Sequence, residues 1–168
     1  MKIANVGVYL LYDRFVYLKV ESDEGLVGWG EATFHGGRIT AQTAHSLGQR
    51  VIGKDPFKTD AIWKDLFQSG YRVGHAGAYV SALGALDIAF YDMKGKALDT
   101  PVWNLMGGKH RDRVPIYSSL MERDLPPEAD VERVQDRMGR GFSWVKLHTG
   151  TAWSFDTGKD RTVETVRA

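Results

Sequence analysis

The segment that decides the fold spans residues 114–149 and reads VPIYSSLMERDLPPEADVERVQDRMGRGFSWVKLHT. It holds a strand-like run, then a stretch with apolar residues at helical spacing that ends at a glycine, then a second strand-like run. We predict these elements at Val114–Leu120, Pro127–Arg140 and Phe142–Thr149, with a further helix beginning over Lys159–Ala168. An order of strand, helix, strand and helix is typical of parallel β/α architecture.

Upstream of this segment the elements follow another order, with strands first and helices after them. Strands are predicted at Lys2–Leu11, Phe15–Glu21 and Leu26–Thr33, joined by short turns as in an antiparallel meander. Helices are predicted over Ile39–Ile52, from Asp55-Pro56 to Gly70, over Ala78–Leu98, and as a short turn over Pro101–Met106. The helix over Ala78–Leu98 is apolar on most of its surface, so we expect it to be the most buried.

This change of order predicts two domains. We expect an α+β domain over residues 1–110, made of the three-stranded antiparallel meander and the helices that follow it. The first β/α units of a second domain are expected over residues 111–168, with the boundary near Lys109–Arg113.

The composition narrows the possible partners and compartments. The 22 Lys and Arg residues nearly balance the 21 Asp and Glu residues, and no block of like charge is present. We therefore expect neither a nucleic-acid nor a membrane partner. The absence of Cys excludes disulfides and thiolate zinc sites. The sequence has no signal-peptide pattern and no apolar run of ~18 residues, so we expect a cytoplasmic protein.

Two titratable side chains share one face of the predicted strand over residues 142–149. Side chains alternate along a strand, so Lys146 and His148 lie opposite Val145 and Leu147. In a parallel barrel the two apolar residues would meet the outer helices, and Lys146 and His148 would point inward near the carboxyl end, where barrel enzymes keep their active sites. Both groups are suited to proton transfer. The alternative is a half-exposed strand whose polar face contacts water.

Other polar residues are weaker candidates. His35 lies in a glycine-rich loop that could cover a site. Asp87 and Asp92 are five residues apart on a predicted helix, about 140° around its axis, and so cannot converge on one ion. We expect each carboxylate to bond a neighbouring loop or backbone amide. Gly28-x-Gly30 lacks the third glycine of a dinucleotide-binding fingerprint and indicates a bulge or a close backbone contact instead.

Three separate stretches resemble one family, the mandelate racemase and muconate-lactonizing group of the enolase superfamily. They are EGLVGWGEA at residues 24–32, SALGALDIAFYDMKGK at residues 81–96 and PVWNLMGG at residues 101–108. The resemblance covers nearly the whole chain. The short link at Tyr12–Phe15 is most similar to the galactonate-dehydratase branch.

The resemblance implies a capping domain that closes over a TIM-type β/α barrel, of which this chain would hold only the start. Many family members carry Lys-x-Lys on the second barrel strand, whose second lysine is a base; here Lys146 matches the first lysine and His148 replaces the second. We expect both residues to be catalytic, with His148 either an alternative base or a substrate contact. Arg14, Phe34 and His35 are expected to contact the substrate from covering loops.

The resemblance also implies Mg²⁺ as cofactor, bound by acidic residues at the ends of the third, fourth and fifth barrel strands. The predicted strands reach only the second, so no residue of this chain is predicted to bind the metal. A closed barrel takes ~250 residues and only about 60 follow the boundary. We therefore expect a fragment or truncated product of a longer protein, which would form a homo-oligomer.

The replaced lysine favours an acid-sugar dehydratase over a plain racemase. Such an enzyme takes the α-proton of a small sugar acid, stabilises the enediolate on Mg²⁺, and loses water from the β-carbon. A racemase or epimerase of the same superfamily is the first alternative. A non-catalytic truncated remnant, acting as an assembly module through its capping sheet, is the second. The present chain alone is expected to be inactive.

Overall fold

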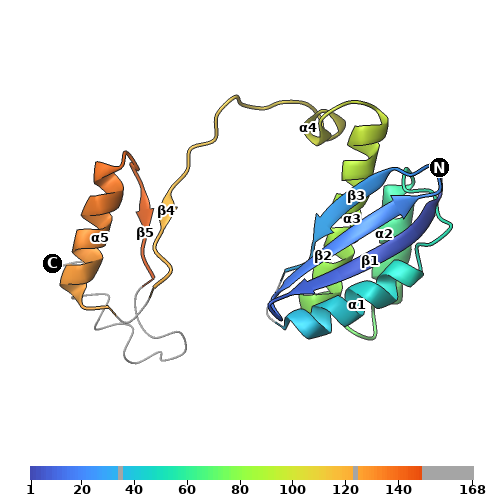
Figure 1. Ribbon diagram of the computed structural model, residues 1–168, viewed down its shortest axis with the longest axis horizontal. Coiled ribbons are helices and arrows are strands. Elements are labelled where there is room, and N and C mark those ends of the chain that lie inside the picture. The colour runs from blue at the N-terminus through green and yellow to red at the C-terminus, as the bar shows by residue number, and fades with distance from the viewer. Residues whose placement is uncertain (34–35, 123–124, 149–168) are drawn as a thin grey trace. The chain divides into compact units, whose positions relative to one another are not determined.

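The computed structural model describes residues 1–33, 36–122 and 125–148 (Figure 1). The chain divides into two compact units, Met1–His110 and a second one that begins at Arg111. The predicted helix over Lys159–Ala168 lies outside the described residues. Within the described ranges, no helix is both long and apolar enough to cross a membrane.

The first unit contains the predicted three-stranded antiparallel sheet, in the order β1-β2-β3. Its strands are β1 (Ile3–Leu11), β2 (Phe15–Ser22) and β3 (Val27–Glu31). A tight hairpin joins β1 to β2, and Tyr12 and Asp13 at its tip both adopt a positive φ of 53°. Every second residue of β2 is buried, which leaves one face of the sheet covered and the other open.

The helices of the first unit are α1 (Gly37–Gln49), α2 (Thr59–Ser69), α3 (Gly77–Ala97) and the short α4 (Val102–Leu105). Two of the helices, α1 and α3, pack against the covered face of this sheet, and α2 and α4 pack against α3 (Figure 1). Helix α1 packs on β1, and α3 packs on β3. Among these helices α3 has the most buried residues, as predicted.

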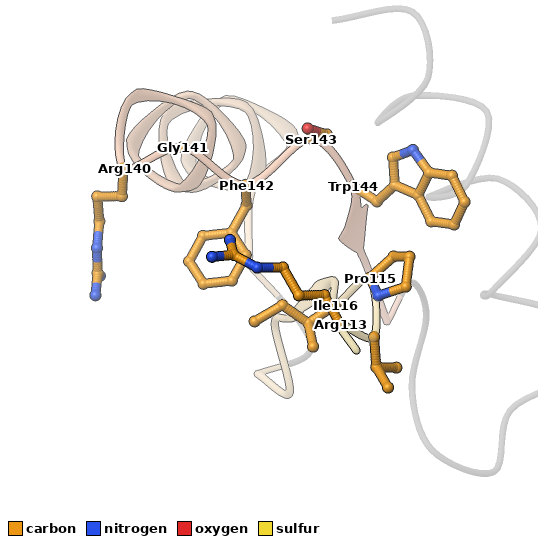
Figure 2. A pocket seen from close by; sticks show the side chains of 9 residues that line it. Arg113, Pro115, Ile116, Arg140, Gly141, Phe142, Ser143 and Trp144 are labelled. Carbon is orange, nitrogen blue, oxygen red and sulfur yellow. The ribbon is translucent and has the colours of Figure 1, made fainter. Parts of the chain in front are cut away.

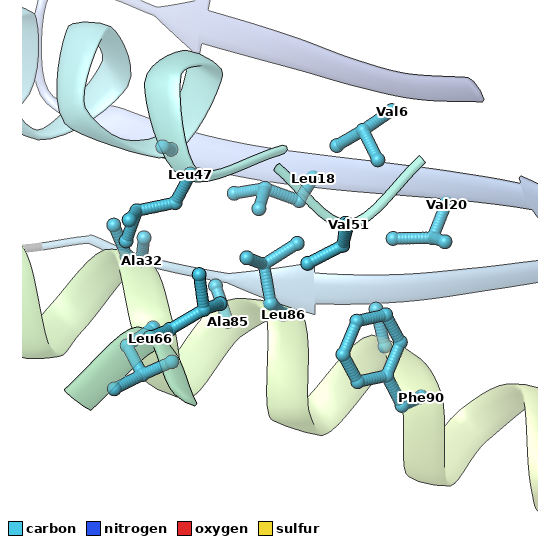
Figure 3. Packing of buried hydrophobic residues seen from close by; sticks show 14 of the residues in the cluster. Val6, Leu18, Val20, Ala32, Leu47, Val51, Leu66, Ala85, Leu86 and Phe90 are labelled. Carbon is cyan, nitrogen blue, oxygen red and sulfur yellow. The ribbon is translucent and has the colours of Figure 1, made fainter. Parts of the chain in front are cut away.

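The core of the first unit lies between the sheet and α3. Figure 3 shows Val6, Leu18 and Val20 of the sheet above Leu86 and Phe90 of α3. All five side chains are at most 5% exposed. Burial of this apolar surface is the main favourable term in folding the unit.

Close contact between β3 and α3 depends on two glycines. A Cβ added to Gly28 would collide with the carbonyl oxygen of Ala89, and one added to Gly30 would collide with that of Ala85. The backbones approach too closely for any side chain between them. The prediction of a close backbone contact at Gly28 and Gly30 is therefore confirmed.

The predicted start of α2 at Asp55-Pro56 is wrong. The helix begins at Thr59, because Asp55 forms a local turn instead of a helix cap. Its side chain accepts a hydrogen bond from the Phe57 N–H at 3.0 Å, and its carbonyl accepts one from the Lys58 N–H at 3.0 Å. The predicted end at Gly70 is confirmed.

Helix α1 also differs from the prediction at both ends, since it begins two residues before Ile39 and ends three before Ile52. The chain leaves the helix because the N–H of Gly53, which has a φ of 79°, bonds to the Ile3 carbonyl at 2.7 Å. This bond ties the end of the turn to β1 and cannot form from a continuing helix.

The second unit contains a strand–helix–strand arrangement with parallel pairing, as predicted. Its elements are β4 (Ser118–Ser119), α5 (Pro127–Gly139) and β5 (Val145–Lys146). Both strands are shorter than the predicted Val114–Leu120 and Phe142–Thr149. Pro115 has no N–H to donate to a ladder, and each strand has one strand neighbour among the described residues.

Candidate active site

The candidate catalytic residues Lys146 and His148 lie at the carboxyl end of β5. Helix α5 ends at Gly141, whose φ is 92°, and the Phe142 N–H bonds back to the Arg137 carbonyl at 3.2 Å. The chain then enters β5, where Val145 pairs with Ser118 and Lys146 pairs with Ser119. Lys146 is the last residue of β5, and His148 follows it by two residues, outside the strand. That both are catalytic and point into a barrel stays a prediction.

The two faces of this short sheet differ in burial. Val145 and Leu147 are half-buried, and Leu120, on the same face of the neighbouring strand, is 2% exposed. On the other face Ser119 and Lys146 are exposed. His148 is half-buried. The predicted alternation in burial therefore holds over residues 145–147 and stops at His148, which is half-buried like Leu147.

Tyr117 lies next to Lys146 and was not among the predicted site residues. The Lys146 Nζ lies 5.4 Å from the centroid of the Tyr117 ring. This neighbour follows from the register, since Tyr117 precedes Ser119 by two residues and shares its face. The sequence predicted the strand that contains Tyr117 but not the register that places it.

The predicted covering-loop residues belong to the first unit. Arg14 follows the β1–β2 hairpin tip, and its guanidinium lies 5.3 Å from the centroid of the Phe15 ring. Phe34 and His35 lie outside the described residues. Of the three predicted substrate contacts, only Arg14 therefore has a described position, and its role stays a prediction.

An ion pair ties the hairpin tip to the start of α1. The Arg38 guanidinium donates two hydrogen bonds to the Asp13 carboxylate, from Nε at 2.9 Å and from Nη2 at 2.7 Å. A Cβ at Gly37 would collide with the carbonyl oxygen of Asp13, so the backbones also touch. The hydrogen bonds from Arg38 hold the pKa of the Asp13 carboxyl below its usual range.

Asp13→Asn is expected to loosen the hairpin tip at neutral pH with little change in the free energy of unfolding. The pair is exposed, and exposed pairs contribute little to stability. Because the folded-state pKa of Asp13 is lowered, the contribution of the pair is present above the unfolded-state pKa and is lost as pH falls through the folded-state value. Amide hydrogen exchange at Arg14, whose N–H bonds to the Leu11 carbonyl, should be faster in the variant.

The matched control for this prediction is Asp99→Asn, since Asp99 also has a positive φ, of 48°, but lies after α3. It should leave exchange at Arg14 unchanged. High salt should narrow the difference between the native chain and Asp13→Asn. Equal exchange rates at Arg14 in both chains at low salt would contradict the prediction.

The prediction that each carboxylate of α3 bonds a neighbouring loop or backbone amide is confirmed for Asp92 and not for Asp87, for which the described residues show no such bond. Asp92 accepts hydrogen bonds from the Trp29 backbone N–H at 2.9 Å and from the Lys96 Nζ at 2.7 Å, which confirms its structural role. Burial raises the pKa of the Asp87 carboxyl, and the negative charge of Asp60 adds to the increase.

Asp87→Asn is expected to raise the free energy of unfolding at pH 7 by less than about 1 kcal/mol, because water screens this half-exposed group. The raised folded-state pKa means that ionised Asp87 destabilises the fold at high pH. The gain should shrink as pH falls through that value and vanish below the unfolded-state pKa, where both states are protonated. Urea unfolding at pH 7 and pH 3 would measure the gain in the free energy of unfolding. An equal gain at both pH values would contradict the claim that ionised Asp87 destabilises the fold.

A metal site needs several His, Cys, Asp or Glu side chains close together. Nowhere in residues 1–33, 36–122 and 125–148 do three His, Cys, Asp or Glu side chains come together as a metal site would require. The described residues therefore provide no Mg²⁺ site of their own.

A cavity of about 550 Å³ lies at the opposite end of the two parallel strands from Lys146 and His148. Figure 2 shows its lining side chains, which come from the segments that precede β4 and β5: Arg113–Ile116 and Arg140–Trp144. Active sites of β/α barrels occupy the carboxyl ends of the strands. We therefore assign no catalytic role to this cavity.

The chain is similar in sequence to known proteins. A family model described as mandelate racemase / muconate lactonizing enzyme, N-terminal domain, matches residues 9–107. The chain is also 38% identical over 149 residues to the D-galactonate dehydratase of Klebsiella pneumoniae (strain 342). This second match covers 88% of the chain and 38% of the dehydratase.

Two solved structures are also similar to the chain. The mandelate racemase/muconate lactonizing protein of Paracoccus denitrificans PD1222, complexed with magnesium, matches with a TM-score of 0.78 and 27% identity, over 87% of this chain and 41% of its own. The 3,6-anhydro-D-galactonate cycloisomerase of Zobellia galactanivorans matches with a TM-score of 0.74 and 25% identity, over 88% and 42%. The chain spans less than half the length of each of these relatives.

Proposed function

Because the chain belongs to the mandelate racemase and muconate-lactonizing enzyme family of the enolase superfamily, we propose that the intact protein is an acid-sugar dehydratase. Its first unit, with a three-stranded sheet and helices, corresponds to the N-terminal capping domain of that family. The start of a β/α barrel follows it.

One observation carries the choice of a dehydratase. The match to the D-galactonate dehydratase extends over 149 residues, more than the 110 of the first unit, so it necessarily continues into the unit that holds Lys146. The likeness is therefore not confined to the capping domain, which enzymes of different reactions share. The cycloisomerase also matches over 88% of the chain, but at 25% identity against 38% for the dehydratase, and this difference in identity favours the dehydratase.

The proposed reaction removes water from a sugar acid. A base takes the proton on the carbon next to the carboxylate, and hydroxide leaves from the following carbon with a proton from an acid, so one water is lost and an enol remains. Lys146 would contact the substrate carboxylate and His148 would handle the proton. Arg14, with Phe34 and His35 on the other covering loop, would contact the rest of the substrate.

The proposal includes Mg²⁺ as the cofactor of the intact protein. The magnesium complex of the Paracoccus relative supports this choice. The family resemblance implies that the proposed ligands are acidic residues at the ends of the third, fourth and fifth barrel strands. Bound there, the cation would supply positive charge to the enediolate.

The test is turnover by the intact protein of a panel of aldonic and aldaric acids with Mg²⁺ in D₂O. Formation of a 2-keto-3-deoxy acid from one or a few members of the panel is the expected result. Exchange of the α-proton without loss of water would support the racemase or epimerase alternative instead. The 168-residue chain is the control and should be inactive; an intact protein that turns over no acid would favour the assembly module.

A further inference from the structure

The contact between Tyr117 and Lys146 is fixed by the backbone. The Ser118 N–H donates to the Trp144 carbonyl at 3.0 Å, and the Leu120 N–H donates to the Lys146 carbonyl at 2.9 Å. These bonds set the parallel register in which Ser119 faces Lys146. The distance of 5.4 Å between the Lys146 Nζ and the Tyr117 ring centroid is within the ~6 Å range of a cation–π interaction.

The same geometry leaves the lysine open to a ligand. Tyr117 is 51% exposed and Lys146 is exposed, so the ring contacts the ammonium on one side only. An ammonium has three donors, and a π-face satisfies none of them as a hydrogen bond. The donors that point away from the ring are therefore available to an acceptor such as a carboxylate.

We propose that Tyr117 is a positioning residue that holds Lys146 as a cation facing the substrate carboxylate. The inference rests on the proposed function, since it assigns a part of the same site. The negative face of an aromatic ring attracts an ammonium and has no such attraction for a neutral amine. Tyr117 thus favours Lys146 as the carboxylate contact and leaves proton abstraction to His148.

The first test measures the contact in the full 168-residue chain by NMR. Lysine labelled with ¹³C at the ε-carbon is incorporated, and K146R identifies the Lys146 resonance. We expect the Lys146 ε-protons to be shifted upfield by the ring current of Tyr117. The shift should persist in Tyr117→Phe, which keeps the ring, and disappear in Tyr117→Leu. A Lys146 resonance that is the same in Tyr117→Leu and the native chain would overturn the proposal.

A matched control is available in the first unit, where the Lys94 Nζ lies 4.9 Å from the Tyr91 ring centroid. Tyr91→Leu should remove the ring-current shift of Lys94 and leave that of Lys146 unchanged. The comparison separates loss of one ring contact from a general change in the spectrum.

The second test measures the role in the intact protein. Tyr117→Leu is expected to raise KM for the sugar acid about fivefold while kcat changes by less than about twofold, and Tyr117→Phe should keep the native KM. A fall in kcat at constant KM, or a KM in Tyr117→Phe as high as in Tyr117→Leu, would overturn the proposal. If the native protein turns over no sugar acid, the proposed function is wrong, and so is the role of Lys146 in binding the substrate carboxylate. The contact between Tyr117 and Lys146 is decided separately, by the NMR result alone.

Discussion

Gly30→Ala is expected to lower the free energy of unfolding of the first unit by about 3 kcal/mol. The added Cβ would collide with the carbonyl oxygen of Ala85, which belongs to the backbone of the most buried helix. A flexible side chain could move aside, but this carbonyl is held by the hydrogen bonds of α3 and by the core around it. The strand must therefore separate from the helix, which exposes apolar surface. Urea unfolding followed by tryptophan fluorescence, to which Trp29 next to Gly30 contributes, would measure the loss.

The same substitution at Gly84 provides the control. Gly84 lies in α3 with no atom within 4 Å of an added Cβ, so Gly84→Ala should stabilise the unit by about 0.5–1 kcal/mol through helix propensity. The two changes thus add the same methyl group with opposite expected signs. A Gly30→Ala chain as stable as the native one would contradict the close packing of β3 on α3.

The order and type of the helices and strands were predictable because each depends on the pattern of apolar and polar residues in its own stretch of sequence. Alternation in Phe15–Ser22 and the apolar surface of Gly77–Ala97 reflect which faces are buried, and burial dominates the energy of folding. The ends of the elements were less predictable, because they depend on single hydrogen bonds to distant residues. Gly53, whose N–H bonds to the Ile3 carbonyl, ends the turn after α1 in this way.

The candidate site was predictable only along one strand. Alternation placed Lys146 and His148 relative to Val145, because side chains change faces at every residue. To predict that Tyr117 lies beside Lys146, the register between the two parallel strands must be known. The spacing of apolar residues does not specify that register when the ladder has only two residue pairs. The Asp13–Arg38 pair likewise joins residues 25 apart through a turn with two positive φ values.

His148→Asn in the intact protein is expected to reduce kcat by about 10²–10⁴-fold, the usual contribution of a general base. Asparagine keeps the polarity and approximate size of the side chain but cannot accept a proton near neutral pH. If His148 takes the α-proton, the variant should lose both dehydration and exchange of the α-proton for deuterium. Lys146→Met should instead raise KM most strongly, because it removes a charge that binds the carboxylate in ground and transition states alike.

His45→Asn is the matched control, since His45 is an exposed residue of α1 and should leave kcat and KM unchanged. The exchange measurement separates the two roles open to His148. A variant that no longer dehydrates but still exchanges the α-proton would place His148 at the departure of hydroxide and require another base. A variant with native kcat and raised KM would show that His148 only contacts the substrate. The histidine that stands where other family members have the second lysine of Lys-x-Lys would then change substrate specificity, and it would not be a replacement base.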